Sequence, residues 1–141
     1  MTLQEGLNAV ERFHSTFGMR VENQPKMDIS EGEMDLRHRL MAEENDEYLE
    51  AVKAGDMVEV ADALGDMLYI LCGTIITHGM QDVMADVFQA IQDSNMSKLG
   101  ADGQPIYRAD GKVMKGPHYF KPDIQGVLQN AGALPAQSLE K

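Results

Sequence analysis

Acidic side chains recur at helical spacing in two neighbouring segments of the chain. The first segment carries Glu43, Glu44 and Glu47, and the second carries Asp62 and Asp66. Residues three or four apart lie on one face of a helix, so each segment can present its carboxylates together. Mg²⁺ prefers carboxylate and water oxygens and often completes its coordination with substrate phosphates. The pattern therefore points to a metal and phosphate site between two helices.

The first acidic segment lies within a helix that we expect to open with a capping box of Ser30 and Glu33 and to end at Gly55. One face of this helix comprises Leu36, Leu40, Glu44, Glu47, Ala51 and Ala54. Most of that face is apolar and should pack inward, so Glu44 and Glu47 interrupt a buried stripe. The alternative is that the acidic run belongs to a solvated face, which is the commoner arrangement for such runs.

The second acidic segment lies in a helix between Asp56 and His78. Glu59, Asp62 and Asp66 form one row on it, whereas most of its other residues are apolar, as is typical of a buried helix. Glu59 has a structural explanation, because Asp56 and Glu59 can form a capping box. Asp62 and Asp66 have none, since Asp is a poor helix former and is rarely buried unless it is paired.

Carboxylates that face a core need compensation. Burying one unpaired charge costs several kcal/mol or more. The chain contains no basic row at matching spacing that could neutralise them. A divalent cation held between the two helices would do so.

Length and charge limit the possible functions. The chain has 141 residues, the size of one domain or of one protomer of an oligomer. Its formal net charge of −11 argues against partners such as nucleic acid polymers or anionic membranes. We expect a chain of this size and helical content to complete its core by pairing with a copy of itself.

Other features of the sequence favour a cytoplasmic protein. The single cysteine, Cys72, is interpreted as a small core residue. No signal peptide is visible, and the apolar run at residues 67–76 is too short and too interrupted to span a bilayer.

The N-terminal region is expected to support the acidic helices. A first helix should cover residues 3–17, opened by a capping box of Thr2 and Glu5 and stopped by Gly18. Its buried stripe would comprise Leu3, Leu7, Val10, Phe13 and Phe17. We expect His14 to be a partly exposed structural histidine. The loop at residues 19–29 is either a lid or an inert connection.

The start of the long acidic helix carries a basic cluster of Arg37, His38 and Arg39. For each of these residues a surface ion pair is the expected role, and a phosphate contact is the alternative.

The C-terminal third carries most of the candidate substrate contacts. A fourth helix is expected at residues 82–99, and the face that begins with its apolar residues ends in Asn95 and Lys98. Asn95 can hydrogen-bond a base or a sugar, and Lys98 can neutralise a phosphate. The alternative for Lys98 is a favourable interaction with the helix C-terminus.

The segment that follows should form a small hairpin, because Asp110-Gly111 separates two short apolar runs. Lys112, Lys115 and Tyr119 make this segment basic and aromatic, suited to close over a nucleotide or to form a dimer-stabilising arm. We expect one domain at residues 1–129 and a flexible tail at residues 130–141.

These motifs resemble a known family. Glu43-Glu44-Asn45-Asp46-Glu47, followed by the stretch from Glu59 to Tyr69, resembles the MazG-like nucleoside triphosphate pyrophosphohydrolases, which carry an ExxE helix followed by an ExxD helix. Dimeric all-α dUTPases and phosphoribosyl-ATP pyrophosphohydrolase belong to the same superfamily. Residues 95–98, 110–112 and 121–123 resemble the C-terminal half of members that act on dUTP. The resemblance covers residues 7–128.

The resemblance implies an all-α bundle of four to five helices with a small C-terminal hairpin or arm, assembled as a dimer or a dimer of dimers. It implies two to three Mg²⁺ or Mn²⁺ ions held by Glu43, Glu44, Glu47 and Asp66. It also implies cleavage of a nucleoside triphosphate between the α and β phosphates, giving a monophosphate and pyrophosphate, with dUTP or another non-canonical nucleotide favoured.

The resemblance also implies roles for individual residues. Glu44 or Glu47 would position or deprotonate the attacking water. Asn95, Lys98, Lys112, Lys115 and Tyr119 would contact the substrate or close the site, with a partner subunit as one source of the closing residues.

One position departs from the family pattern. Many members have a Glu three residues before the residue matched to Asp66, and here that position is Ala63. We favour Asp62, one turn from Asp66, as the replacement ligand, and Glu59 is the alternative.

Three other functions stay open at this stage. The same chemistry could act on a purine triphosphate such as dGTP or GTP. The chain could be a non-catalytic metal-binding or nucleotide-binding helical module. It could also be a structural helical protein whose acidic residues are only surface charge.

Overall fold

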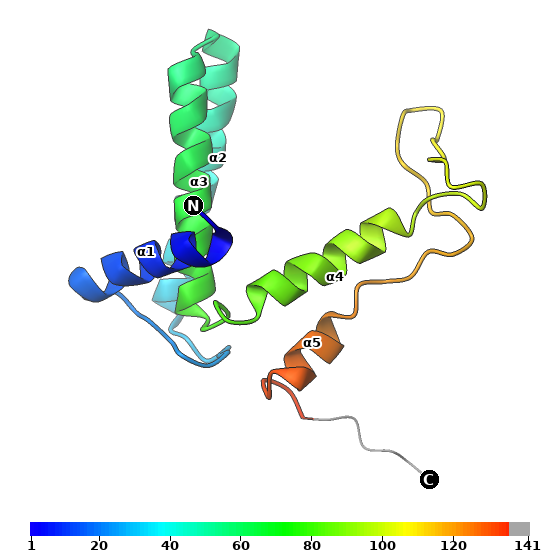
Figure 1. The fold of residues 1–141 in the computed structure, drawn as a ribbon. Helices are drawn as coiled ribbons and strands as arrows, with labels where there is room; N and C mark the ends of the chain where they lie inside the picture. Colours follow the sequence, from blue (N-terminus) through cyan, green and yellow to red (C-terminus); the bar gives the residue numbers. More distant parts are fainter. Residues whose placement is uncertain (136–141) are drawn as a thin grey trace. The chain divides into compact units, whose positions relative to one another are not determined.

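The computed structural model describes residues 1–135, which form five helices and no strand, so the predicted all-α class is confirmed. Figure 1 shows the helices as α1 (Leu3–Thr16), α2 (Glu31–Ala54), α3 (Met57–Thr77), α4 (Met84–Met96) and α5 (Ile124–Asn130). Contacts divide the chain into two compact units. The first unit is Met1–Asp82 with α1 to α3, and the second begins at Val83 and contains α4 and α5.

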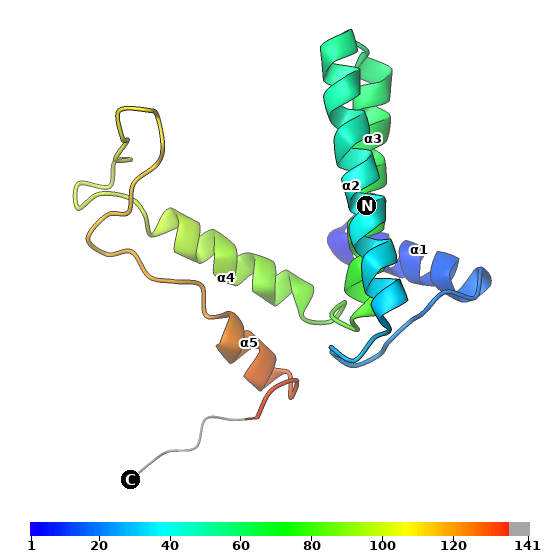
Figure 2. The same cartoon turned by 180° about the vertical axis from the view of Figure 1, so that it is seen from behind.

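The first unit is built on a helical hairpin. α2 and α3 lie side by side in both views, and α1 packs across α3 (Figures 1 and 2). The hairpin turns at Gly55, which ends α2 in the left-handed conformation with φ 68° and leaves Asp56 to cap α3. Glycine suits this position because it adopts positive φ without steric penalty. The two acidic helices are therefore neighbours, as their sequence predicted.

The helix caps agree with the sequence in part. Thr2 and Glu5 form the complete capping box predicted for α1. Ser30 and Asp56 each accept a bond from the backbone three residues on, but no reciprocal bond closes either box. The Glu33 carboxylate instead pairs with Arg20 Nε at 2.5 Å, which ties the loop after α1 to the start of α2.

The apolar core of the first unit runs between α2 and α3 and continues under α1. Its buried residues in the first unit include Leu7, Val10, Ile29, Ala51, Ala63, Cys72, Ile75 and Ile76. The prediction for Cys72 is thus confirmed, and burial raises the pKa of its thiol. The predicted stripe of α1 was wrong for Leu3, Phe13 and Phe17, which are exposed in the single chain. Phe13 still contacts Tyr69 of α3, with ring centres 5.7 Å apart, but the contact leaves its ring exposed in the single chain.

The loop between α1 and α2 is fastened to the end of α3. The Glu22 amide donates to the carbonyl of Ile76 at 3.2 Å, and the Lys26 amide donates to that of His78 at 2.9 Å. Gly79 lets the chains approach, because a Cβ there would lie 2.0 Å from the carbonyl oxygen of Gln24. These bonds favour the interpretation of the loop as a connection over that of a lid.

Helix α3 is less buried than its sequence predicted. Leu64, Leu68 and Leu71 on its central turns are exposed, as is Met57 with an exposed fraction of 83%. A helix buried nearly all round was therefore the wrong expectation for the single chain. Apolar residues surround α3, but α1 and α2 cover only part of its circumference.

The length of α3 also corrects an earlier estimate. Among the described residues, one helix, α3, is long enough and apolar enough to cross a membrane, judged by length and composition alone. The expectation that its apolar run is too short was wrong, because the helix continues well beyond residues 67–76. A single such helix is weak evidence for a membrane span, since core helices of globular proteins have the same properties.

The second unit is a helix followed by an irregular arm. α4 is shorter at both ends than predicted, beginning at Met84 after a turn and ending at Met96. The arm returns to it, since Ser94 Oγ donates to the Phe120 carbonyl at 2.8 Å and the Phe120 amide donates to Ser97 Oγ at 3.1 Å. The segment after α4 thus packs onto α4.

The predicted hairpin is present as a turn. Tyr107 and Val113 form an isolated antiparallel bridge around Gly111, whose φ is 87°. Asp123 caps the short helix α5, which includes Asn130, the first residue of the predicted tail. The domain boundary stays a prediction, and residues 136–141 of the proposed tail lie outside the described part of the chain.

Candidate metal and phosphate site

Three acidic side chains of the hairpin gather around a fourth, Glu44. Glu44 on α2 is half-buried, whereas Glu47, Asp62 and Asp66 are exposed in the single chain. The charges of all three act on Glu44, so the two helices do bring these carboxylates together. The expectation that they face the core was wrong for the single chain, because Glu47, Asp62 and Asp66 are exposed and only Glu44 is half-buried.

Glu44 is electrostatically unsatisfied. Its Oε2 atom is shielded from solvent and has no hydrogen-bond partner. Desolvation raises the pKa of Glu44 to about 7, aided by a hydrogen-bonding contact with Glu47 and by the charges of Glu47, Asp66 and Asp62. A carboxyl group retains its proton when burial and like charges oppose ionisation. A bound proton or a bound cation would therefore neutralise the charge of the Glu44 carboxylate.

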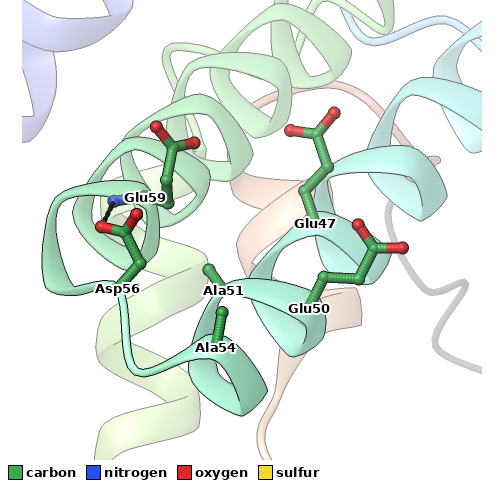
Figure 3. A pocket seen from close by; sticks show the side chains of 6 residues that line it. All are labelled: Glu47, Glu50, Ala51, Ala54, Asp56 and Glu59. Atoms are coloured by element: carbon green, nitrogen blue, oxygen red, sulfur yellow. Dashed lines mark hydrogen bonds between the residues drawn. The ribbon is translucent and has the colours of Figure 1, made fainter.

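A cavity of about 400 Å³ lies next to this group, at the tip of the hairpin. Figure 3 shows its lining, with Glu47 and Glu50 on α2 and Asp56 and Glu59 at the start of α3. Ala51 and Ala54 form its floor. The Asp56 carboxylate accepts the Glu59 amide at 3.1 Å, which fixes the first turn of α3 (Figure 3). Small floor residues and acidic walls leave room for a charged ligand beside Glu47.

The two candidates for the fourth ligand occupy different places. Asp62 contributes to the electrostatic field at Glu44, and Glu59 lines the cavity with Glu47. Glu43 lies apart from both, since its carboxylate is 3.8 Å from Arg39 Nε in an exposed ion pair. That pair confirms the surface role predicted for Arg39.

The donor set suits a hard divalent cation. Carboxylate oxygens are the ligands that Mg²⁺ and Mn²⁺ prefer, and the orphaned Oε2 of Glu44 offers an unused acceptor. Among residues 1–135, however, no group of three or more His, Cys, Asp or Glu side chains is arranged to hold a metal ion. The ligand chemistry therefore fits, and the carboxylates would have to draw closer around an ion.

The predicted substrate-binding residues all belong to the second unit. Lys115 Nζ lies 4.6 Å from the centre of the Tyr119 ring, a cation–π contact. The Gly116 amide between them donates to the Lys98 carbonyl at 2.9 Å. Lys98, Lys115 and Tyr119 are thus neighbours at the end of α4.

The two remaining substrate candidates are exposed. Asn95 lies on the last turn of α4, and Lys112 lies in the hairpin turn, where its amide donates to Asp110 Oδ1 at 3.1 Å. Their roles, like those of the acidic residues, stay predictions.

Two residues of the first unit differ from their predictions. Arg37 is only 8% exposed and makes no ion pair within the described residues, although a surface ion pair was expected. His14 is 2% exposed rather than partly exposed, and its Nδ1 is 2.8 Å from the Arg20 carbonyl. The missed signal is Gly73 near the C-terminal end of α3, where a Cβ would lie 2.9 Å from both Arg37 Nη2 and His14 Nε2.

Comparison with models of known protein families matches residues 10–95 to the model described as phosphoribosyl-ATP pyrophosphohydrolase. The match covers more than half of the chain and includes Glu43, Glu44, Glu47, Asp62 and Asp66. It ends at Asn95, so Lys98, Lys112, Lys115 and Tyr119 lie beyond it. No curated protein matches the chain.

Proposed function

The chain belongs to the phosphoribosyl-ATP pyrophosphohydrolase family of MazG-like all-α pyrophosphohydrolases, and from this premise we propose that it hydrolyses dUTP or another non-canonical nucleoside triphosphate. Cleavage falls between the α and β phosphates and yields a nucleoside monophosphate and pyrophosphate. The observation that carries the proposal is the gathering of Glu47, Asp62 and Asp66 around the unsatisfied Glu44. Such a site is built for cations that accompany a polyphosphate.

Two to three Mg²⁺ or Mn²⁺ ions are proposed to be held by Glu44, Glu47, Asp62 and Asp66. Bound there, they would lower the pKa of the attacking water and neutralise the leaving pyrophosphate. Glu43 is proposed as a further ligand once it exchanges its exposed pair with Arg39 for the site. Asp62 is preferred to Glu59 because its charge acts on Glu44 together with that of Asp66.

The chain itself supplies the proton acceptor and the orientation of the water. We assign the acceptor to Glu47, which is exposed to the solvent that provides the water, whereas Glu44 is half-buried. A positioned carboxylate of this kind typically contributes about 10²–10⁴-fold to the rate. Glu44 holds Glu47 in place through their contact and keeps the site selective for a ligand that brings positive charge.

Substrate recognition is proposed to come from Asn95, Lys98, Lys112, Lys115 and Tyr119. These residues offer an amide, three ammonium groups and an aromatic ring, which suit a sugar, phosphates and a base respectively. The proximity of Lys98 to Gly116, and of Lys115 to Tyr119, supports a shared role. They act on the acidic site of the same chain or on that of a partner copy.

The active form is proposed to be a homodimer or a dimer of dimers. Met57, Leu64, Leu68 and Leu71 leave a large apolar part of α3 exposed, which monomeric soluble proteins rarely tolerate. A second copy would cover this surface, and the acidic row on the same helix favours a protein partner over lipid. A cytoplasmic location is proposed because nucleoside triphosphates are found there.

A second candidate substrate is phosphoribosyl-ATP, because the matching family model carries that name. The purine triphosphates dGTP and GTP are further candidates, since the chemistry at the phosphates is the same. A non-catalytic metal-binding or nucleotide-binding module is the alternative of a different class, and it predicts binding without turnover.

The deciding experiment is a panel of nucleotides incubated with the purified chain and Mg²⁺, with products identified by chromatography. The panel contains dUTP, the common deoxynucleoside and ribonucleoside triphosphates, and phosphoribosyl-ATP. Monophosphate and pyrophosphate from dUTP support the proposal, and turnover of phosphoribosyl-ATP alone favours the second candidate. Diphosphate and phosphate as products, or no turnover of any compound, would overturn the proposed chemistry.

A further inference from the structure

Arg37 links α2 to α3 through a closed set of hydrogen bonds. Its Nε donates to Thr74 Oγ1 at 3.1 Å, and its Nη2 donates to the carbonyl of Ile70 at 3.2 Å. Thr74 Oγ1 in turn donates to the same Ile70 carbonyl at 3.0 Å. Two nitrogens of one guanidinium thus converge on one carbonyl, directly and through a hydroxyl. The planar, rigid guanidinium makes such a two-point contact specific in direction as well as in distance.

The surroundings of Arg37 exclude the simpler role of neutralising an acid. The residue is 8% exposed, and desolvation is the one cause that lowers its pKa. Its hydrogen-bond partners are a neutral hydroxyl and a carbonyl. An unpaired buried charge is expensive, so its retention calls for a role that an apolar side chain could not perform.

Gly73 provides the space for this contact. A Cβ at residue 73 would lie 2.9 Å from Arg37 Nη2 and 2.9 Å from His14 Nε2. Glycine in the middle of a helix is unfavourable, so its presence on the buried side of α3 fits a need for close approach. The side chain of His14 is fixed from its other nitrogen by the Arg20 carbonyl at 2.8 Å, which places α1 in the same assembly.

The position of this contact along the hairpin connects it to the acidic site. Arg37 lies seven residues before Glu44 on α2, two turns along one face. On α3, Asp66, Ile70 and Thr74 follow one another at four-residue spacing, so Ile70 is one turn from Asp66. A slip of one turn between the helices would displace Glu44 from Asp66 by about 5.4 Å, more than a shared cation can bridge.

We propose that Arg37 is a positioning residue: with Thr74, Ile70 and the space left by Gly73, it fixes the axial register of α2 against α3 and so sets Glu44 and Glu47 opposite Asp62 and Asp66. The inference rests on the proposed function, because it is the proposed metal ligands that this register holds opposite one another. It assigns no contact with substrate to Arg37.

The test uses full-length Arg37→Met and Gly73→Ala, which remove the contact from opposite sides. Gly65→Ala is the matched control, since a Cβ at residue 65 of the same helix meets nothing within 4 Å. Mn²⁺ affinity is measured by electron paramagnetic resonance without substrate. We expect Arg37→Met and Gly73→Ala to lose about tenfold or more in affinity, as is usual when a supporting residue of a metal site is removed. Gly65→Ala should bind Mn²⁺ like the parent chain.

A milder pair of variants separates positioning from general destabilisation. Thr74→Val removes the hydroxyl that relays Arg37 to Ile70, and Thr74→Ser keeps it. Affinity should fall with valine and recover with serine. In steady-state assays the metal concentration for half-maximal activity should rise for Arg37→Met, and saturating Mn²⁺ should recover most of kcat. Loss of thermal stability with unchanged Mn²⁺ affinity would mean that Arg37 is only structural, and it would overturn the proposal.

A direct measurement of register keeps the inference testable if the catalytic proposal fails. Nitroxide labels at the exposed positions Asp46 on α2 and Ala61 on α3 report the spacing of the helices, with labelled chains diluted in unlabelled ones. Arg37→Met should change the dipolar broadening of this pair, and Gly65→Ala should not. If the parent chain binds no Mn²⁺, the proposed function is wrong. The dipolar broadening alone then decides whether Arg37 fixes the register. Equal dipolar broadening in the parent chain and in Arg37→Met would overturn the proposal that Arg37 fixes the register of α2 against α3.

Discussion

The two ends of the α2–α3 hairpin differ in how the same helix face is used. The base, where Gly73 and Ile76 lie, is covered by α1 and the loop after it, and both residues are buried. The tip, near Gly55, carries Asp62 and Asp66 on the same row of α3, and both are exposed. One continuous stripe is therefore a core at the base and an open acidic surface at the tip.

The two ends also differ in whether their charged side chains have hydrogen-bond partners. At the base, Arg37 is buried but bonded to the Thr74 hydroxyl and the Ile70 carbonyl. At the tip, Glu44 has an orphaned oxygen and acidic neighbours, so its pKa rises to about 7. Satisfied polar groups stabilise a fold, whereas a carboxyl group whose pKa is raised by desolvation and like charges is a candidate for binding or chemistry. The base is thus built for stability and the tip for binding.

The largest expected effect comes from the tip. Glu47→Gln should lower kcat/KM for pyrophosphate release by about 10³-fold, because it removes a ligand and the proton acceptor without changing side-chain volume. The unfolding temperature should change little, since Glu47 is exposed. Steady-state kinetics and thermal unfolding measure the two quantities.

Glu31→Gln is the matched control for that variant. Glu31 is an exposed acid on the first turn of the same helix, at the base of the hairpin. It should keep parental activity. Parental activity in Glu47→Gln instead would remove the tip as the catalytic site.

The second effect is a loss of stability at the base. Ile76 is fully buried, so Ile76→Ala should lower the free energy of unfolding by about 2–5 kcal/mol. Leu68 on α3 is 59% exposed, so Leu68→Ala should lower the free energy of unfolding of the single chain much less. Chemical denaturation at matched protein concentration provides both values.

Leu68 also tests the proposed self-association. If a second copy covers α3, Leu68→Ala should lower the average molar mass in sedimentation at low concentration, and Ile76→Ala should do so only on unfolding. An unchanged mass for Leu68→Ala together with a monomeric parent chain would contradict the proposed oligomer.

Sequence reasoning was most successful where local physics decides. The turn at Gly55, the Thr2–Glu5 capping box and the bounds of α2 and α3 follow from helix caps and breakers that act within a few residues. The pairing of the acidic helices followed from the same short turn. The bounds of α4 were less well predicted, because no side chain caps its start.

Burial was harder to predict because it depends on distant elements. Periodicity placed Phe13 and Phe17 in a core stripe, yet both are exposed in the single chain, although Phe13 contacts Tyr69 of α3. Arg37 and His14 were assigned to the surface because charged and titratable residues usually lie there. Their burial depends on Gly73, thirty-six residues from Arg37 in sequence, and no local pattern reports that contact.

The third effect compares two glycines at the ends of α3. Gly55 and Gly79 have nearly the same φ, 68° and 65°. A Cβ at Gly55 meets nothing within 4 Å, so Gly55→Ala should cost about 1 kcal/mol for the left-handed conformation alone. A Cβ at Gly79 would lie 2.0 Å from the Gln24 carbonyl oxygen, so Gly79→Ala should cost more, by displacing the loop. Equal losses in denaturation would mean that the base is no more tightly packed than the tip.

The last effect is a pH dependence confined to the tip. With its pKa raised to about 7, Glu44 keeps a proton that the unfolded chain has lost above its ordinary value of 4.5. Its contribution to the stability of the metal-free chain is therefore greatest on the acid side and declines as pH rises from 4.5 to about 7. A cation must displace that proton, so Mn²⁺ affinity should rise about tenfold per pH unit below pH 7 and level off above it.

Calorimetric titration in buffers of different ionisation heat measures the linked proton directly. About one proton should be released per site at a pH near 6, and Glu44→Gln should abolish that release while the base of the hairpin stays folded. The buried Arg37 at the base stays charged throughout this range and releases no proton. Mn²⁺ affinity that does not change between about pH 5.5 and 7.5 would show that Glu44 is not a ligand, and the tip would then be an acidic surface without a metal.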